Sequence, residues 1–207
     1  MRATARELRG RGGKPVERAV LVDRTRFIFR SRSTRIFWLV QMSYEMWEPL
    51  GSVDEVLHVE RLVEGFVAPL LLRWRELDVN HSLSVVLFTR LEKDAGCDDL
   101  YWVAVENEQA GRIDDVAFVA KLKRELVAFS KSLAPRLARG VVARATNGNV
   151  LEAINLALNV LDKHYMDRDL QRTGNSIVLL TAGGGVFSVN SQLAQDPTPR
   201  MIDQGNG

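Results

Sequence analysis

The chain has 207 residues, of which 46% are hydrophobic and 26% charged, the composition of a globular protein of one domain. Its apolar runs are far shorter than the roughly 18 residues that a membrane span requires. The single cysteine, Cys97, excludes an internal disulfide, and the first residues lack the charged, apolar and small-residue order of a secretory leader. We therefore expect a soluble, intracellular protein.

The net charge of +2 conceals an uneven distribution. Residues 1–35 carry eleven basic and three acidic side chains, a net charge of +8, which leaves −6 for the rest of the chain. We interpret residues 1–25 as a basic, poorly ordered arm that binds an anionic membrane surface or an acidic partner, or else is a solvated tail. Nucleic acid is not expected, because aromatic residues suited to base stacking do not alternate with the arginines.

The first half of the chain predicts strands around one long helix. Aromatic and β-branched runs predict strands at 26–30 and 34–41. Apolar residues at three- and four-residue steps predict an amphipathic helix over 53–77, bent at Pro69. A short apolar run predicts a further buried strand at 83–89.

A hairpin and a second helix are predicted next. The run at 101–105 is expected to pair with the preceding strand around a long polar loop at 91–99. Helical spacing then predicts a helix over 116–129 that ends before Pro135, because proline cannot continue the hydrogen-bond ladder of a helix.

The last predicted elements complete an α/β pattern. A helix is predicted over 149–161, with Asn149 and Glu152 placed like a cap and its reciprocal partner, and a buried strand follows at 176–180. Strands alternating with helices predict an α/β fold with a largely parallel sheet and helices on both faces. Because no strand is predicted after the final helical signals, we expect a domain that is incomplete at its C-terminus and leaves one sheet edge uncovered.

Enzyme signatures do not emerge from the sequence. The glycines at 183–185 lack the Gly-Lys-Ser/Thr ending of a phosphate-binding loop. Cys97 lies among acidic residues, which work against a reactive thiolate. The histidines His58, His81 and His164 show no metal-ligand spacing. We therefore predict no catalytic residues and no cofactor.

One set of positions spans three predicted strand ends or helix starts. Gln41, Ser43 and Glu45 follow the first buried strand, Thr146 precedes the helix at 149–161, and Ala182 follows the last strand. This arrangement resembles the von Willebrand factor A fold, in which Asp-x-Ser-x-Ser, a Thr and Thr-Asp-Gly at those places build a magnesium site.

Relative to that pattern, Ser43 and Thr146 match, while Gln41 replaces an Asp, Glu45 a Ser and Ala182 an Asp. A hard dication prefers carboxylate oxygens, and Glu45 alone supplies one. We therefore predict a degenerate site that binds no magnesium; the alternative is a metal-dependent ligand-binding module of the von Willebrand type.

A closer resemblance covers most of the chain, from residue 26 to residue 207. Blocks in family order are Gln-Met-Ser-Tyr-Glu-Met-Trp at 41–47, Val-Val-Leu-Phe-Thr-Arg at 85–90, Gly-Asn-Val-Leu-Glu-Ala-Ile-Asn-Leu at 148–156, Asp-Lys-His-Tyr at 162–165 and Arg-Met-Ile-Asp at 200–203. They resemble the large DEP-domain subunit of the fungal SEACIT complex, called GATOR in animals.

This resemblance implies a scaffold without chemistry of its own. The family's large subunit joins two smaller subunits in a complex that activates GTP hydrolysis by Rag GTPases and restrains TOR signalling during amino acid starvation. Residues 26–207 would be its von Willebrand A-like assembly domain, working in the cytoplasm at the surface of the vacuole or lysosome membrane. The activating arginine belongs to a smaller subunit, so this chain is not itself expected to be an enzyme.

A dense polar block follows the helix predicted over 149–161. Its tyrosine and charged side chains favour a contact surface for the smaller subunits, or else internal ion pairs and caps that lead into the last strand. The candidate contact residues are Asp162, Lys163, His164, Tyr165, Asp169 and Arg172.

Overall fold

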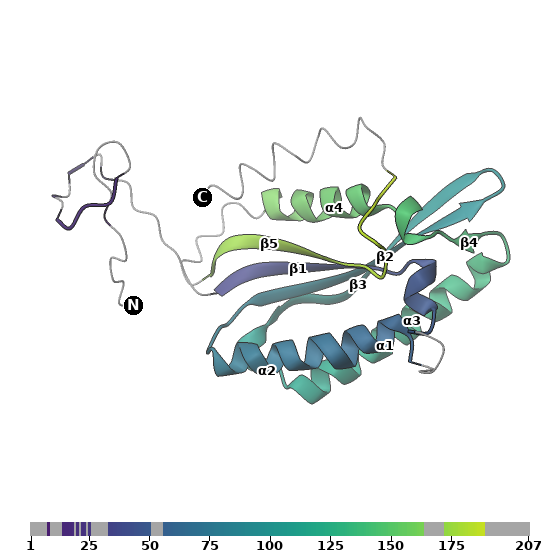
Figure 1. Ribbon diagram of the computed structural model, residues 1–207, viewed down its shortest axis with the longest axis horizontal. Coiled ribbons are helices and arrows are strands. Elements are labelled where there is room, and N and C mark those ends of the chain that lie inside the picture. The colour runs from purple at the N-terminus through teal and green to yellow at the C-terminus, as the bar shows by residue number, and fades with distance from the viewer. Residues whose placement is uncertain are drawn as a thin grey trace.

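The computed structural model describes residues 8, 14–18, 20, 22, 23, 25, 33–50, 56–163 and 172–188. Of residues 111, 162, 163, 172 and 173 it describes the backbone alone. The strand predicted at 26–30 lies outside the described residues. Within them, a single sheet lies between two layers of helices (Figure 1).

The sheet is mixed, with a parallel centre. Strand β1 pairs in parallel with β2 on one side and with β5 on the other, while β3 and the short β4 are antiparallel to β2. The strand order is β3-β2-β1-β5. These strands confirm the predicted α/β fold: β1 (Ser33–Gln41), β2 (Ser82–Lys93), β3 (Gly96–Gln109), β4 (Val141–Val142) and β5 (Arg172–Leu180).

Helices cover both faces of the sheet, as predicted. The helices that follow β1 and β3 pack on one face, and the helix that precedes β5 packs on the other (Figure 1). On the first face lie α1 (His58–Arg61), the π-helix η2 (Leu62–Val67), α2 (Ala68–Glu76) and α3 (Asp115–Leu137); on the second lies α4 (Val150–Lys163). Short 3₁₀ turns complete the connections: η1 (Tyr44–Trp47), η3 (Ala110–Arg112) and η4 (Ala145–Asn147).

Alternation along β1 creates the two halves of the core. Trp38 faces the α1–α3 layer, where its ring lies 5.8 Å from that of Trp74 and 6.1 Å from that of Phe66. Leu39 points to the opposite face and packs with the α4 layer. Because successive side chains of a strand point to opposite faces, one continuous apolar run serves both layers.

The connection between β2 and β3 is a tight turn, so the predicted long loop at 91–99 is wrong. Only Asp94 and Ala95 separate the paired residues Lys93 and Gly96, and Gly96 has a φ of 103°. The polar residues that suggested a loop instead form ion pairs across the strands, among them Lys93 with Asp98. Charged residues are common in loops, but pairs of opposite charge that face each other across two strands also stabilise an exposed hairpin.

The helical segment after β1 is less regular than predicted. Helix begins at His58, residues 53–55 lie outside the described residues, and the π-helix η2 interrupts the α-helical segment just before Pro69. In η2 the backbone N–H of Ala68 donates to the carbonyl of Val63, five residues earlier. Pro69 then falls at the second residue of α2, directly after this π-turn.

Two helix-end predictions are also wrong. Helix α3 does not end before Pro135 but continues to Leu137, because buried Leu133 extends its apolar stripe to the last turn. At the start of α4 the side chain of Asn149 is buried beside the Tyr101 hydroxyl, and its polar atoms do not cap the helix. Glu152 binds Arg90 at 2.9 Å instead of reaching back to Asn149, so the reciprocal cap does not form.

Arg90 fixes the start of α4 against the sheet. Its guanidinium donates to both carboxylate oxygens of Asp99 on β3, at 2.7 and 2.9 Å, and to Glu152 on α4. Those hydrogen bonds, with Asp99 the stronger partner, raise the pKa of Arg90 and so favour its charged form. The loop that precedes α4 is thereby held at a defined place over the ends of the strands.

Candidate functional site

Three segments meet where β1 and β5 end: the turn η1 after β1, the turn η4 before α4, and the chain after β5. Here the structure gathers the predicted site residues, which we call the strand-end rim: Gln41, Ser43, Glu45, Thr146 and Ala182. Gln41 and Ser43 are almost fully buried, Glu45 and Ala182 are partly buried, and Thr146 is exposed. The carboxyl ends of parallel strands are the usual location of sites in such sheets.

The side-chain amide of Gln41 connects the three segments. Its Nε2 donates to the carbonyl oxygen of Ala145 at 2.9 Å, and its Oε1 accepts from the Thr181 hydroxyl at 2.6 Å. The Thr181 Oγ1 also accepts from the backbone N–H of Gly183 at 3.1 Å. An amide can do this because it both donates and accepts, whereas an ionised aspartate only accepts.

Small residues permit this close approach. A Cβ added at Gly148 would overlap Nε2 of Gln41, and one added at Gly183 would overlap the Cβ of Ala145. The roles of Gly148 and Thr181 were not predicted from the sequence, although both lie within two residues of predicted rim positions. The Thr-x-Gly order at 181–183 was the available signal, since a glycine there suggests that two stretches of backbone approach closely.

Glu45 is the one carboxylate of the strand-end rim, and it binds backbone. Its Oε2 accepts from the N–H of Ala145 at 2.9 Å. Burial raises the pKa of Glu45, but hydrogen bonds from the backbone N–H groups of Glu45 and Ala145, together with the nearby charge of Arg144, outweigh burial and lower it. Glu45 is therefore held as a carboxylate against η4.

The remaining groups of the strand-end rim fit a magnesium ion poorly. Ser43 is buried and its Oγ makes no hydrogen bond with a described residue, although its nearness to Glu45 favours the charged carboxylate. Both polar atoms of the Gln41 side chain are already bonded, and Ala182 offers no side-chain oxygen. Magnesium prefers octahedral oxygen coordination with one or two carboxylates, and here a single carboxylate faces neutral groups.

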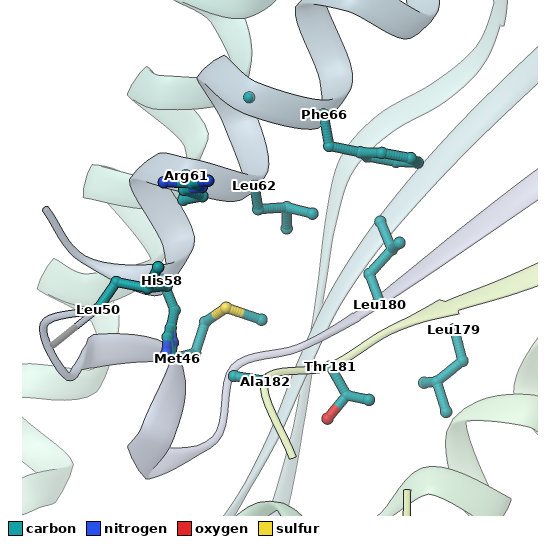
Figure 2. A pocket seen from close by; sticks show the side chains of 11 residues that line it. Met46, Leu50, His58, Arg61, Leu62, Phe66, Leu179, Leu180, Thr181 and Ala182 are labelled. Carbon is teal, nitrogen blue, oxygen red and sulfur yellow. The ribbon is translucent and has the colours of Figure 1, made fainter. Parts of the chain in front are cut away.

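The described residues also hold no cluster of three or more His, Cys, Asp or Glu side chains that could hold a metal ion. A groove of about 490 Å³ adjoins the strand-end rim on the α1–α3 face of the sheet (Figure 2). It shares Ala182 with the strand-end rim, is also lined by Thr181, the hydrogen-bond partner of Gln41, and is bounded on its other side by α1 and η2. The rim is therefore part of a larger, mainly apolar surface.

The predicted subunit-contact residues lie elsewhere. Asp162 and Lys163 belong to the last turn of α4, and Arg172 begins β5, at the opposite end of that strand from Thr181. The structure describes only the backbone of these three, and His164, Tyr165 and Asp169 lie outside the described residues. Their contact role stays a prediction.

The parallel centre of the sheet, the helices on both faces and the strand-end rim define an α/β domain of the von Willebrand A-like class. Residues 33–207 match the family described as the vWA-like domain of vacuolar membrane-associated protein Iml1. The chain belongs to that family.

Relatives agree with this assignment. The chain is 37% identical to a DEP domain-containing protein of Dictyostelium discoideum over 228 residues, covering 100% of this chain and 10% of the relative. It is 33% identical to the GATOR complex protein Iml1 of Drosophila melanogaster, covering 94% and 14%. It is 30% identical to the vacuolar membrane-associated protein iml1 of Schizosaccharomyces pombe, covering 88% and 15%. The chain thus spans only a small part of each relative.

The close approach at Gly148 yields a first prediction. Gly148→Ala should destabilise the chain by about 1–3 kcal/mol, the usual cost of overpacking, because the new methyl group displaces the Gln41 amide. Urea unfolding followed by circular dichroism measures the change.

Gly184→Ala is the matched control, since a Cβ there meets nothing within 4 Å, and it should change stability by less than about 0.5 kcal/mol. Combining Gly148→Ala with Gln41→Ala should cost less than the two single changes together. Strict additivity would show that Gly148 and Gln41 do not interact.

Glu45 yields a pH prediction. Because its pKa is lowered on folding from about 4.5, its contribution to stability is complete above pH 4.5 and is lost as the pH falls through the folded-state pKa. Glu45→Gln should therefore reduce the free energy of unfolding by about 1 kcal/mol at pH 7, and by progressively less below pH 4.5. Urea titrations across that range test it.

The exposed carboxylate of Glu48 controls for net charge. Glu48→Gln should alter the free energy of unfolding by less than about 0.5 kcal/mol at either pH. A Glu45→Gln penalty that stays constant down to pH 3 would mean that the carboxylate charge makes no contribution.

Proposed function

We propose that residues 26–207 form a non-catalytic assembly domain that holds the two smaller subunits of a SEACIT or GATOR complex. The single observation that carries the proposal is the side-chain amide of Gln41. At a position where the von Willebrand A pattern has a metal-binding Asp, this neutral group joins the three segments by hydrogen bonds, in a domain whose relatives include a GATOR complex protein. A rim closed by hydrogen bonds presents a fixed shape and no open coordination position. Such a surface suits protein contact better than ion-dependent ligand binding.

Through that complex, the chain would contribute to GTPase activation without catalytic residues of its own. The GTPases are the Rag proteins, and the consequence is restraint of TOR signalling when amino acids are scarce. Several relatives are named as vacuolar membrane-associated, and no helix within the described residues is long and apolar enough to cross a bilayer. We propose a peripheral location at the cytoplasmic surface of the vacuole or lysosome, with residues 1–25 contributing positive charge toward anionic lipid.

Co-purification tests the assembly role. A full-length relative, carrying either this chain in place of its own vWA-like domain (the intact form) or a flexible Gly/Ser linker there (the replaced form), is co-expressed with the two smaller subunits. The intact form should retain both subunits, and the replaced form should lose at least one and should no longer accelerate GTP hydrolysis by Rag proteins. Retention of both subunits by the replaced form would contradict the proposal.

Calorimetry tests whether the strand-end rim binds metal. Titration of this chain with magnesium or manganese should give no micromolar binding, because Glu45 alone supplies a carboxylate and its Oε2 is engaged by the Ala145 N–H. Gln41→Asp combined with Ala182→Asp is the comparison variant, since it supplies the acids of the von Willebrand A pattern. Micromolar binding to the unchanged chain, abolished by Glu45→Ala, would favour the metal-dependent module instead.

A further inference from the structure

The groove beside the strand-end rim has two apolar walls. Leu62 and Phe66 project from the η2 side, and Leu180 and Ala182 line the β5 side, with Met46 of η1 at one end (Figure 2). Phe66 remains 40% exposed even though its ring contacts Trp38. An aromatic ring that is anchored in the core and exposed along one side is the kind of residue that anchors a protein contact.

The π-helix shapes the helical wall. Gly65 has no side chain, and a Cβ there would meet only Arg61, at 3.8 Å or more. The wall is therefore low between Arg61 and Phe66, which lets another backbone come near. Single π-turns within helices are rare and occur frequently at functional sites.

The polypeptide that directly follows β5 leaves toward the other face of the sheet. Phe187 packs with the α4 layer, and the N–H of Ser188 donates to the carbonyl of Thr146 at 2.6 Å. Among the described residues after β5, these two therefore lie on the α4 side of the sheet and do not line the groove. The proposed assembly function points to another polypeptide as the occupant of the groove.

Charge specifies one feature of that occupant. The acidic neighbours of Arg61 are engaged, since Glu60 accepts from the Leu57 N–H at 3.2 Å and Glu64 pairs with Lys123 at 2.5 Å. Arg61 itself is exposed and makes no ion pair with a described residue, while it lines the groove. A carboxylate beside the apolar walls would complete this arrangement, preferably in bidentate geometry.

We propose that the groove receives the apolar face of an amphipathic helix from one of the two smaller subunits, with an acidic side chain of that helix against Arg61. Helices that pack side by side lie about 8–10 Å apart, which is roughly the width of two strands. A helix placed beside η2 would therefore lie over β5, so we expect a helix in this position. Apolar anchors along one helix face then fill the groove, as in other helix-in-groove contacts. This inference rests on the proposed assembly function.

Site-specific photo-crosslinking in the full complex tests it. A photoreactive phenylalanine analogue replaces Phe66 in the full-length relative that carries this chain, which is co-expressed with both smaller subunits, and crosslinked peptides are identified by mass spectrometry. Leu72, which is 50% exposed on α2 but does not line the groove, is the matched control position. We expect a crosslink from position 66, and none from position 72, to a helical segment of a smaller subunit that carries an acidic residue.

Charge reversal supplies a second measurement. Arg61→Glu should weaken binding of that subunit by at least tenfold, and replacing the acidic residue of the crosslinked segment with Arg should restore binding. Arg73→Glu, at an exposed site paired with Glu76 outside the groove, should change the affinity less than threefold. Unchanged melting curves for both variants show that folding is unaffected.

The outcomes separate the two proposals. If the smaller subunits bind this full-length polypeptide but position 66 crosslinks only within its own chain, or Arg61→Glu binds them normally, the groove inference is wrong and the assembly function stands. If neither smaller subunit binds the unchanged polypeptide, both proposals are wrong.

Discussion

The side-chain amide of Gln41 ties the end of β1 to segments 104 and 140 residues further along the chain. Its donor meets the carbonyl of Ala145, and its acceptor meets the hydroxyl of Thr181. An aspartate in this position would turn a negative charge toward that carbonyl and would require a cation to bridge the two oxygens. With an amide the bridge is direct, through two hydrogen bonds made by one neutral side chain. Because Gln41 is only 1% exposed, water does not compete for these bonds.

The hydrogen bonds of Gln41 also position part of the groove wall. Thr181 binds Gln41 and also lines the groove, and the next residue, Ala182, lines it as well. On the other side of the rim, Glu45 binds the Ala145 N–H while the adjacent Met46 faces the groove. The contacts that close the rim therefore hold two parts of the groove wall. A wall that is already in place loses little conformational entropy when another helix packs on it, which favours tight association from a modest area.

Sequence patterns predicted the central elements because each has a single, strong signal. The continuous apolar run of β1 reflects burial on both faces, the helical spacing of α4 reflects burial on one, and both elements are present in the structure. The hairpin was predicted, but its loop was placed at 91–99 because cross-strand ion pairs such as Arg90 with Asp99 have the composition of a loop. The π-helix has no periodic signature of its own. The rim positions were found by their places after strands, but the partner of Gln41 could not be, since Thr181 reaches it only once the whole sheet is assembled.

The carboxylate of Glu45, at a position where the von Willebrand A pattern has a Ser, shows why a resemblance in sequence does not fix a resemblance in chemistry. In the von Willebrand A pattern an acid at this edge would be expected to serve an ion, yet here the Glu45 carboxylate accepts from a backbone N–H of η4 and its pKa is lowered by such bonds. The charge is used to hold a turn in place. Three residues act on the turn η4. Gln41 donates to the carbonyl of Ala145, Glu45 accepts from its N–H, and Gly148 leaves room for the Gln41 amide. Changing Gln41 to an acid would remove the donor to Ala145 and place a second carboxylate near Glu45, so the acids of the von Willebrand A pattern cannot be introduced here singly without the loss of a contact.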